Sequence, residues 1–112
     1  METLANRHCV PCHAGTPRLS GAEAAALLRE LRGWTMEGGE RLSKEYRFAD
    51  FRSALAFVAR VGEVAEGEDH HPDVEFGWGY ARLKIQTHAV GGLTENDFIL
   101  AARIDALSAA GD

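Results

Sequence analysis

The chain has 112 residues, a length typical of a single folded domain, and 46% of its residues are hydrophobic. Acidic and basic side chains are mixed along it and the formal net charge is −5, so direct binding to nucleic acid is not expected, because that usually requires a basic patch. The apolar runs are too short to span a bilayer, and residues 1–8 lack the apolar core of a signal peptide. We therefore expect a cytoplasmic protein with reduced cysteines and no membrane contact.

The N-terminal part is expected to be an irregular arm over residues 1–18, followed by one domain over residues 19–112. The arm contains prolines and glycine and no regular apolar period. A capping box follows at Ser20, where the hydroxyl can accept from the amide of Glu23 and the glutamate can reach back. We predict a helix from here to about Leu31, stopped by Gly33, with its inner side formed by Leu27, Leu28 and Leu31.

A β-hairpin is predicted next. Its first strand covers residues 34–37, and Gly38-Gly39 forms the turn, because both glycines tolerate positive φ. The return strand covers residues 41–48. Its alternation places one set of side chains on the same face, namely Leu42, Lys44, Tyr46 and Phe48.

The longest helix is predicted over residues 51–66, with Asp50 as its N-cap and an end near Gly67. Apolar side chains at helical spacing predict the face that packs on the sheet, namely Phe51, Leu55, Val58, Val61 and Gly62.

A second hairpin is predicted from residues 73–78 and 80–88. One face of its second strand carries Ala81, Leu83, Ile85 and Thr87, and the other face ends with Gln86 and His88. The last helix opens at Thr94 with a variant capping box closed by Asp97. Leu93 and Phe98 are spaced as a hydrophobic staple, and the buried side of the helix is expected to contain Leu100, Ile104 and Leu107.

The predicted order is α-β-β-α-β-β-α. Because both strand pairs are hairpins, we expect an α+β fold with a four-stranded antiparallel sheet and three helices packed on one face. One sheet face and the sheet edges then stay open, which favours a ligand or a second copy of the chain.

Histidines give the most specific chemical pattern. The second hairpin should bring the His70-His71 corner close to His88 at its far end. Imidazole is the only side chain that naturally titrates near neutral pH, so such a cluster indicates proton transfer or a metal site. The plainer interpretation is that His70 and His71 are turn residues before Pro72 and that His88 is an exposed strand end. A metal-dependent hydrolase is a weaker interpretation, because adjacent histidines in a turn do not form an open three-ligand site.

The same residues belong to a longer pattern. Glu66-x-x-x-His70-His71-Pro72 is followed by Trp78, by Thr87-His88 and by Gly92-Leu93-Thr94-x-x-Asp97. Upstream are Leu31-x-Gly33-Trp34, Tyr46-x-Phe48-x-Asp50-Phe51 and Phe57-Val58-x-Arg60-Val61. Over residues 20–107 the chain resembles the pterin-4a-carbinolamine dehydratases.

The resemblance implies dehydration of a 4a-hydroxytetrahydropterin to the quinonoid dihydropterin, in recycling of a tetrahydropterin cofactor for an aromatic amino-acid hydroxylase. It implies general acid–base catalysis by His70, His71 and His88, with no metal and no cofactor. We favour His71 and His88 as the acid–base pair, with His70 binding or assisting. It also implies a homodimer or homotetramer whose edge strands join into one sheet.

Seven further residues are candidates for binding the pterin, namely Glu66, Asp69, Pro72, Trp34, Trp78, Thr87 and Asp97. The two tryptophans can stack on a flat ring, although aromatic residues in strands are more often core residues. Asp97 can meet a polar ligand at a helix N-terminus or serve only as a helix cap. Glu66 can orient a histidine or lie in solvent at a helix end.

Two alternatives remain open. The first is a non-catalytic binding module that supports dimerisation or assembly of another protein, as some members of the family do. The second concerns Cys9 and Cys12, which have the spacing of half a zinc site that His8 and His13 or another copy of the chain could complete. No other cysteine exists to complete that site, so a flexible arm with a reduced dithiol is the simpler expectation.

Overall fold

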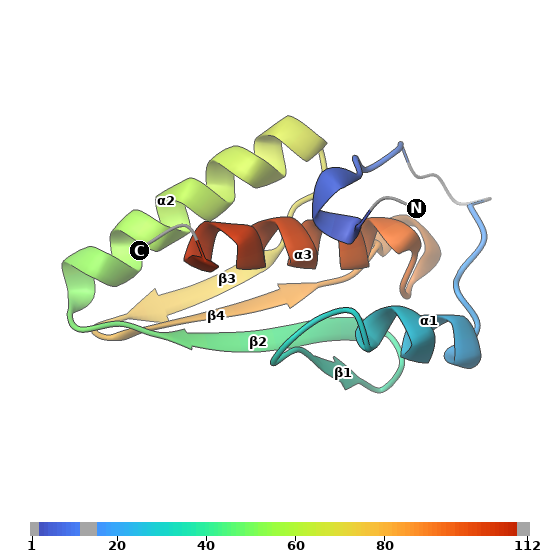
Figure 1. Cartoon of the computed structure of the whole chain (residues 1–112), viewed down its shortest axis with the longest axis horizontal. Coiled ribbons are helices and arrows are strands. Elements are labelled where there is room, and N and C mark those ends of the chain that lie inside the picture. Colours follow the sequence, from blue (N-terminus) through green and yellow to red (C-terminus); the bar gives the residue numbers. More distant parts are fainter. Residues whose placement is uncertain (1–2, 12–15, 110–112) are drawn as a thin grey trace.

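The computed structural model describes residues 3–11 and 16–109, and its order of helices and strands is the predicted one. Figure 1 shows the main elements along the chain, which are α1 (Gly21–Leu28), β1 (Thr35–Glu37), β2 (Arg41–Arg47), α2 (Phe51–Glu68), β3 (Asp73–Gly77), β4 (Tyr80–Ile85) and α3 (Glu95–Ala109). Two 3-10 turns, η1 (Leu4–Asn6) and η2 (His88–Val90), complete the described elements. None of the helices in these described ranges is long and apolar enough to cross a membrane.

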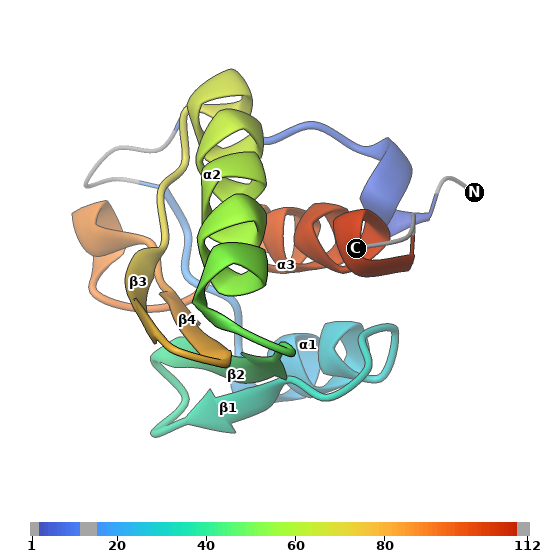
Figure 2. The ribbon, with the colours of Figure 1, turned by 90° about the vertical axis from the view of Figure 1, so that its left-hand side faces the viewer.

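The four strands form one antiparallel sheet in the order β1-β2-β4-β3. The two hairpins meet through β2 and β4, where Tyr46 lies opposite Ala81, and β1 and β3 are left at the edges. The helices lie on one face of this sheet (Figure 2). The other face carries charged cross-strand pairs, including Arg82 with Glu45 at 2.6 Å and with Glu75 at 3.2 Å. The predicted α+β class is therefore confirmed.

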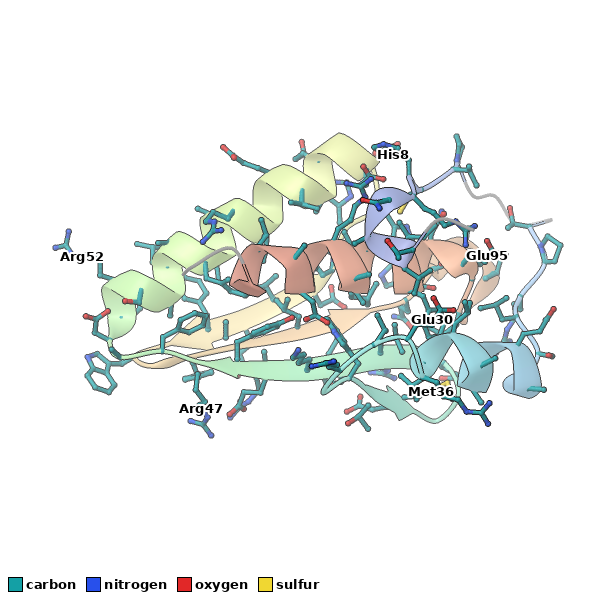
Figure 3. The ribbon with its side chains drawn as sticks, in the orientation of Figure 1. His8, Glu30, Met36, Arg47, Arg52 and Glu95 are labelled. Carbon is teal, nitrogen blue, oxygen red and sulfur yellow. The ribbon has the colours of Figure 1, made fainter. Side chains whose placement is uncertain are left out.

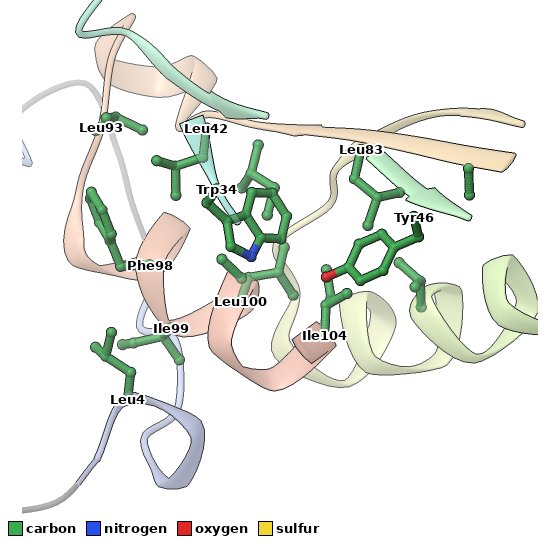
Figure 4. Packing of buried hydrophobic residues seen from close by; sticks show 14 of the residues in the cluster. Leu4, Trp34, Leu42, Tyr46, Leu83, Leu93, Phe98, Ile99, Leu100 and Ile104 are labelled. Atoms are coloured by element: carbon green, nitrogen blue, oxygen red, sulfur yellow. The ribbon is translucent and has the colours of Figure 1, made fainter. Parts of the chain in front are cut away.

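The core lies between β2, β4 and α3 (Figure 4). The alternation predicted for β4 is confirmed, because Ala81, Leu83, Ile85 and Thr87 are all buried. Leu93 and Phe98 are buried at the start of α3, as a hydrophobic staple requires. α3 therefore has a fixed position against the sheet from its first turn.

The face of α2 that packs on the sheet matches the predicted one only in part, because Val61 is buried and Val58 is partly buried against the core. Phe51 and Leu55 are 45% and 47% exposed, and the fully buried side chains are Ala54, Phe57, Val61 and Ala65. The ring of Phe57 sets this rotation, because its centroid lies 4.6 Å from that of Tyr46 and 5.1 Å from that of Phe48. Apolar residues occur on more than one side of α2, so their spacing alone could not select the buried side.

The predicted helix starts are confirmed at two caps. Both hydrogen bonds of the Ser20–Glu23 capping box are present, and Asp50 accepts from the amide of Ser53 at 2.8 Å. Some predicted ends are wrong. α1 ends at Leu28 because the next amides tighten into bonds to the third preceding residue, from Glu30 to Leu27 and from Leu31 to Leu28.

The strand β4 ends three residues earlier than predicted. The amide of Thr87 donates to the carbonyl of Gly92 at 2.9 Å, which closes a small loop after the strand. His88 therefore begins the 3-10 turn η2 and does not end a strand. This loop turns the chain toward the start of α3.

The N-terminal arm is more ordered than predicted. Residues 3–11 contain the 3-10 turn η1, and Leu4 is a buried member of the core cluster next to α3. The arm predicted to be irregular therefore contributes one side chain, Leu4, to the core. Its anchoring side chain is isolated in the sequence, so no periodic pattern marked it as a core residue.

Candidate active site

A cavity of about 280 Å³ lies at the open end of the β3–β4 hairpin. It brings together His70, His71 and His88. The remaining lining residues come from the arm, the α2–β3 connection, the segment after β4 and the start of α3, namely Val10, Pro11, Asp69, Gln86, Thr87, Ala89 and Asn96. We take this histidine pocket as the candidate active site.

The end of α2 fixes the backbone at His70. Asp69 adopts the left-handed conformation with φ of 51°, and its amide donates to the carbonyl of Glu66. The amide of His70 donates to the carbonyl of Ala65 at 3.2 Å. This pair of bonds is the Schellman arrangement, which usually has glycine where Asp69 stands. His70 is therefore held directly against the helix end, and His71 and Pro72 lead into β3.

The imidazole of His70 is fixed by Asp97. Its Nε2 lies 2.7 Å from Oδ1 of Asp97, and the side chains are 10% and 0% exposed. A carboxylate accepts hydrogen bonds, so Nε2 carries the proton in this pair. Nδ1 is then the only ring nitrogen of His70 that can exchange a proton with a bound molecule.

Asp97 is itself held by donors. Its Oδ2 accepts from the hydroxyl of Thr87 at 2.8 Å and from the amide of Thr94 at 2.9 Å. Because Thr87 uses its only proton here, the contact of 2.9 Å between the two threonine hydroxyls must have Thr94 as the donor. These bonds supply Asp97 with donors only and hold its carboxylate turned toward His70. Thr87 and Asp97 were both predicted to bind substrate. Thr87 lines the pocket, whereas Asp97 is not among the lining residues and contacts His70.

The other two histidines are exposed. Nε2 of His71 contacts the carboxylate of Glu66, which lies in the last turn of α2. Nδ1 of His88 lies 3.4 Å from Nε2 of Gln86. Glu66 therefore orients a histidine in this structure and is not among the residues that line the pocket. Asp69 does line it, whereas Pro72 follows His71 outside the lining.

The structure does not bring the two tryptophans to the histidine pocket. Trp34 is buried in the core, and its Nε1 donates to Asp105 at 3.0 Å. Trp78 is 71% exposed in the turn after β3, at the opposite end of the hairpin from the histidines. Because of these positions, neither tryptophan can stack on a ring held in this pocket of the same chain. The sequence pattern placed both residues in or beside strands but did not specify which end of the sheet each would occupy.

A larger cavity of about 630 Å³ lies between η1, the α1–β1 connection and α3, and contains none of the histidines. In it Asp105 accepts from Lys44 at 2.8 Å, from Trp34 and from the hydroxyl of Tyr46. Lys44 and Asp105 form an ion pair, and Trp34 and Tyr46 donate further hydrogen bonds to the same carboxylate. The arrangement explains why Lys44 is tolerated on the inner face of β2, and it offers no proton-transfer group comparable with the histidines.

Sequence reasoning missed several residues of the pocket, namely Val10, Pro11, Gln86, Ala89 and Asn96. Gln86 could have been found, since the predicted strand placed it on the same face as His88. The arm residues could not, because nothing in their sequence indicates where the arm packs.

The carboxylate of Glu68 lies at the edge of this region. Burial acts to raise its pKa, but hydrogen bonds from the Cys9 amide and from His8, together with the charge of Arg103, outweigh burial and hold the pKa of Glu68 below its usual value. Among the described residues, no three His, Cys, Asp or Glu side chains are grouped so that they could hold a metal ion. Cys12 and His13 lie outside the described residues, so the cysteine-based zinc site stays a hypothesis.

Known proteins with this pattern are dehydratases by name. Residues 17–107 match the family described as pterin 4 alpha carbinolamine dehydratase. A protein of Rubrobacter xylanophilus that is provisionally named pterin-4-alpha-carbinolamine dehydratase is 50% identical over 107 residues, covering 96% of this chain and 100% of that protein. A protein of Azoarcus sp. with the same provisional name is 43% identical over 100% of this chain and 97% of its own.

Two solved structures share the fold. The crystal structure of a transcriptional coactivator/pterin dehydratase from Brucella melitensis matches with a TM-score of 0.77 and 33% identity, over 81% of this chain and 98% of that one. A pterin dehydratase-like protein, identified as a RuBisCO assembly factor in the alpha-carboxysome, matches with a TM-score of 0.60 and 26% identity, over 69% of this chain and 90% of that one. The family match covers most of the chain and includes all three pocket histidines. The chain therefore belongs to the pterin-4a-carbinolamine dehydratase family.

Proposed function

We propose that this chain dehydrates a 4a-hydroxytetrahydropterin to the quinonoid dihydropterin by histidine acid–base catalysis. The observation that carries the proposal is the meeting of His70, His71 and His88 in one pocket, with His70 fixed by the buried Asp97. The products of such a reaction are the quinonoid dihydropterin and water. The physiological role would be recycling of the tetrahydropterin used by an aromatic amino-acid hydroxylase.

The chemistry needs one proton donor and one proton acceptor. The donor protonates the hydroxyl on the carbon beside a ring nitrogen, and the C–O bond breaks to release water. The acceptor removes the proton from that nitrogen, and the N–H electron pair forms the new C=N bond. Imidazole suits both tasks, because its pKa lies near neutral pH.

We assign the proton transfers to His71 and His88, and hydrogen bonding to the pterin to His70. The first two side chains are exposed, so each can return to its starting protonation state by exchange with water. Nε2 of His70 is committed to Asp97, which leaves Nδ1 to meet the ligand. The Glu66 carboxylate contacts Nε2 of His71, which orients that ring and supports a role as acid.

The direct test is an assay with freshly generated 4a-hydroxytetrahydropterin, followed in the ultraviolet. The parent protein at catalytic concentration should speed the loss of water well above the uncatalysed rate. An unchanged rate, combined with tight binding of a pterin, would contradict dehydration and support a binding module.

Association with another chain is the second part of the proposal, and one observation favours it. The edge strand β3 and the start of α2 expose apolar side chains, including Val74 at 39% and Phe51 at 45%. An exposed apolar edge favours pairing with another chain. We propose a second copy of this chain as the first occupant, giving a homodimer or homotetramer in which β3 strands pair.

A further inference from the structure

The arm segment Arg7–Pro11 is attached to the ends of two helices. The side chain of Asn96, in the first turn of α3, bonds to both backbone groups of Val10. Its Oδ1 accepts from the Val10 amide at 3.0 Å, and its Nδ2 donates to the Val10 carbonyl at 2.6 Å. Asn96 is buried, so this reciprocal pair fixes the backbone of Val10 as a β-ladder would.

A second attachment lies at the end of α2. Glu68 accepts from the Cys9 amide at 2.7 Å, and its other oxygen lies 2.9 Å from Nδ1 of His8. Figure 3 shows His8 beside this end of α2. Farther along α3, Arg103 donates to the carbonyl of Arg7 at 2.6 Å. The segment is therefore bonded through the backbone of Arg7, Cys9 and Val10 and through the side chain of His8.

Both attachments adjoin the histidine pocket. Glu68 stands two residues before His70, and Asn96 stands directly before Asp97, the partner of His70. Val10 and Pro11 then lie on the pocket as lining residues. The Val10 side chain is 64% exposed, so packing of the protein core does not account for its position.

We propose that the arm segment Arg7–Pro11 is a wall of the active site, and that Asn96 is a positioning residue which holds this wall against the bound pterin. The inference rests on the proposed function and extends it to residues outside the matched family region, which begins at residue 17. Val10 and Pro11 supply apolar surface for a flat heteroaromatic ring, while the histidines supply its polar contacts. The wall acts on ground-state and transition-state binding alike, so its removal weakens affinity more than turnover.

The test uses the full chain and measures two quantities. The first is the dissociation constant of 7,8-dihydropterin, a stable pterin probe, and the second is the split between KM and kcat in the dehydration assay. Asn96→Leu has a similar volume and cannot make either bond to Val10. We expect it to raise the dissociation constant and KM by about tenfold, equivalent to ~1.4 kcal/mol. Turnover at saturating substrate should stay within about threefold of the parent.

A second variant tests the same wall without changing a buried side chain, so a loss of binding cannot result from misfolding. Val10→Asp changes an exposed side chain, so thermal stability should stay at the parent value. It places a carboxylate where the ring needs an apolar surface, and should also raise the dissociation constant by about tenfold. Asn6→Asp is the matched control, because it adds the same charge to an exposed position of η1 and should leave binding unchanged.

Three outcomes overturn the inference. Parental dissociation constants and KM in both Asn96→Leu and Val10→Asp would show that the arm is not a wall. An equal loss in Asn6→Asp would show a general charge effect. A loss confined to kcat would place the effect on the catalytic groups. A parent that neither binds the probe nor dehydrates the carbinolamine overturns the proposed function as well, so the two failures are distinguishable.

Discussion

Nε2 of His70 donates to Oδ1 of Asp97 over 2.7 Å, and no part of the Asp97 side chain is exposed. The carboxylate comes from the first turn of α3, whereas the histidine follows the last turn of α2. One hydrogen bond thus links the two helices at the pocket and selects the tautomer of His70. We therefore expect Asp97 to act through His70.

Replacing Asp97 with asparagine tests this role. The amide can present an N–H to Nε2 and so favour the opposite tautomer of His70. We expect turnover to fall by about 10²-fold, within the range of positioned acid–base groups. Stability should fall by about 1–3 kcal/mol, because the buried network loses its charged acceptor. Asp73→Asn, the same change at an exposed position of β3, should match the parent. Parental turnover in a folded Asp97→Asn protein would contradict the assignment.

Glu68 should make the stability of the arm depend on pH. Its pKa is lowered in the folded chain, because hydrogen bonds from Cys9 and His8 and the charge of Arg103 outweigh the effect of burial. A carboxyl group whose pKa is lowered by folding stabilises the folded protein at pH values above its unfolded pKa. This stabilisation is lost as the pH falls through the folded pKa. Glu68→Ala should therefore cost about 1–3 kcal/mol at pH 7.

The cost should be constant above the ordinary glutamate pKa of 4.5 and should shrink as the pH is lowered beneath it. Urea unfolding of both proteins between pH 3 and pH 7 measures this difference. Glu63→Ala, at an exposed position of the same helix, should change stability by less than about 0.5 kcal/mol at either pH. A difference between Glu68→Ala and parent that grew toward acid pH would reverse the predicted sign.

Leu4 should contribute to global stability although it belongs to the arm. Its side chain is buried with Ile99 and other residues of the core cluster (Figure 4). Leu4→Ala should lower the free energy of unfolding by about 2–5 kcal/mol. Asn6→Ala, two residues on and exposed, should cost less than about 0.5 kcal/mol. If Leu4→Ala unfolds at the same urea concentration as the parent, the arm does not pack as described.

The exposed edge of the sheet predicts association. We expect light scattering at micromolar concentration to give the mass of a dimer or tetramer. Val74→Asp on β3 should shift the protein toward monomer, because a charge would be buried at the strand pairing. Thr35→Asp, the same charge on the opposite edge strand β1, should keep the parental mass. A monomeric parent would count decisively against the proposed assembly.

Much of the fold could be predicted because its signals are local. The Ser20–Glu23 capping box, the Gly38-Gly39 turn and the alternation in β4 each depend on residues a few positions apart. The hairpin then implies that His70-His71 and His88 are neighbours, and the three do line one pocket. That Asp97 belongs near the site was also a sequence expectation.

Other features depend on packing between distant segments. Asn96 and Val10 are 86 positions apart, and no periodicity connects an irregular arm with a helix start. On α2 the predictions for Phe51 and Leu55 were wrong, because both are large apolar residues and the small Ala54 faces the sheet in their place. Trp34 was predicted to stack on the pterin ring, but its Nε1 donates to Asp105 and its side chain lies in the core.

The most direct test of the account is the dehydration rate of the double variant His71→Ala, His88→Ala. Freshly generated 4a-hydroxytetrahydropterin is mixed with the parent, the double variant or the Lys84→Ala control, each shown to be folded by circular dichroism. We expect the double variant to lose at least about 10²-fold in turnover, because positioned acid–base groups typically contribute that much each. Lys84→Ala, an exposed change on β4 away from the pocket, should stay near the parent. A folded double variant that dehydrates the carbinolamine as fast as the parent would contradict histidine catalysis in this chain.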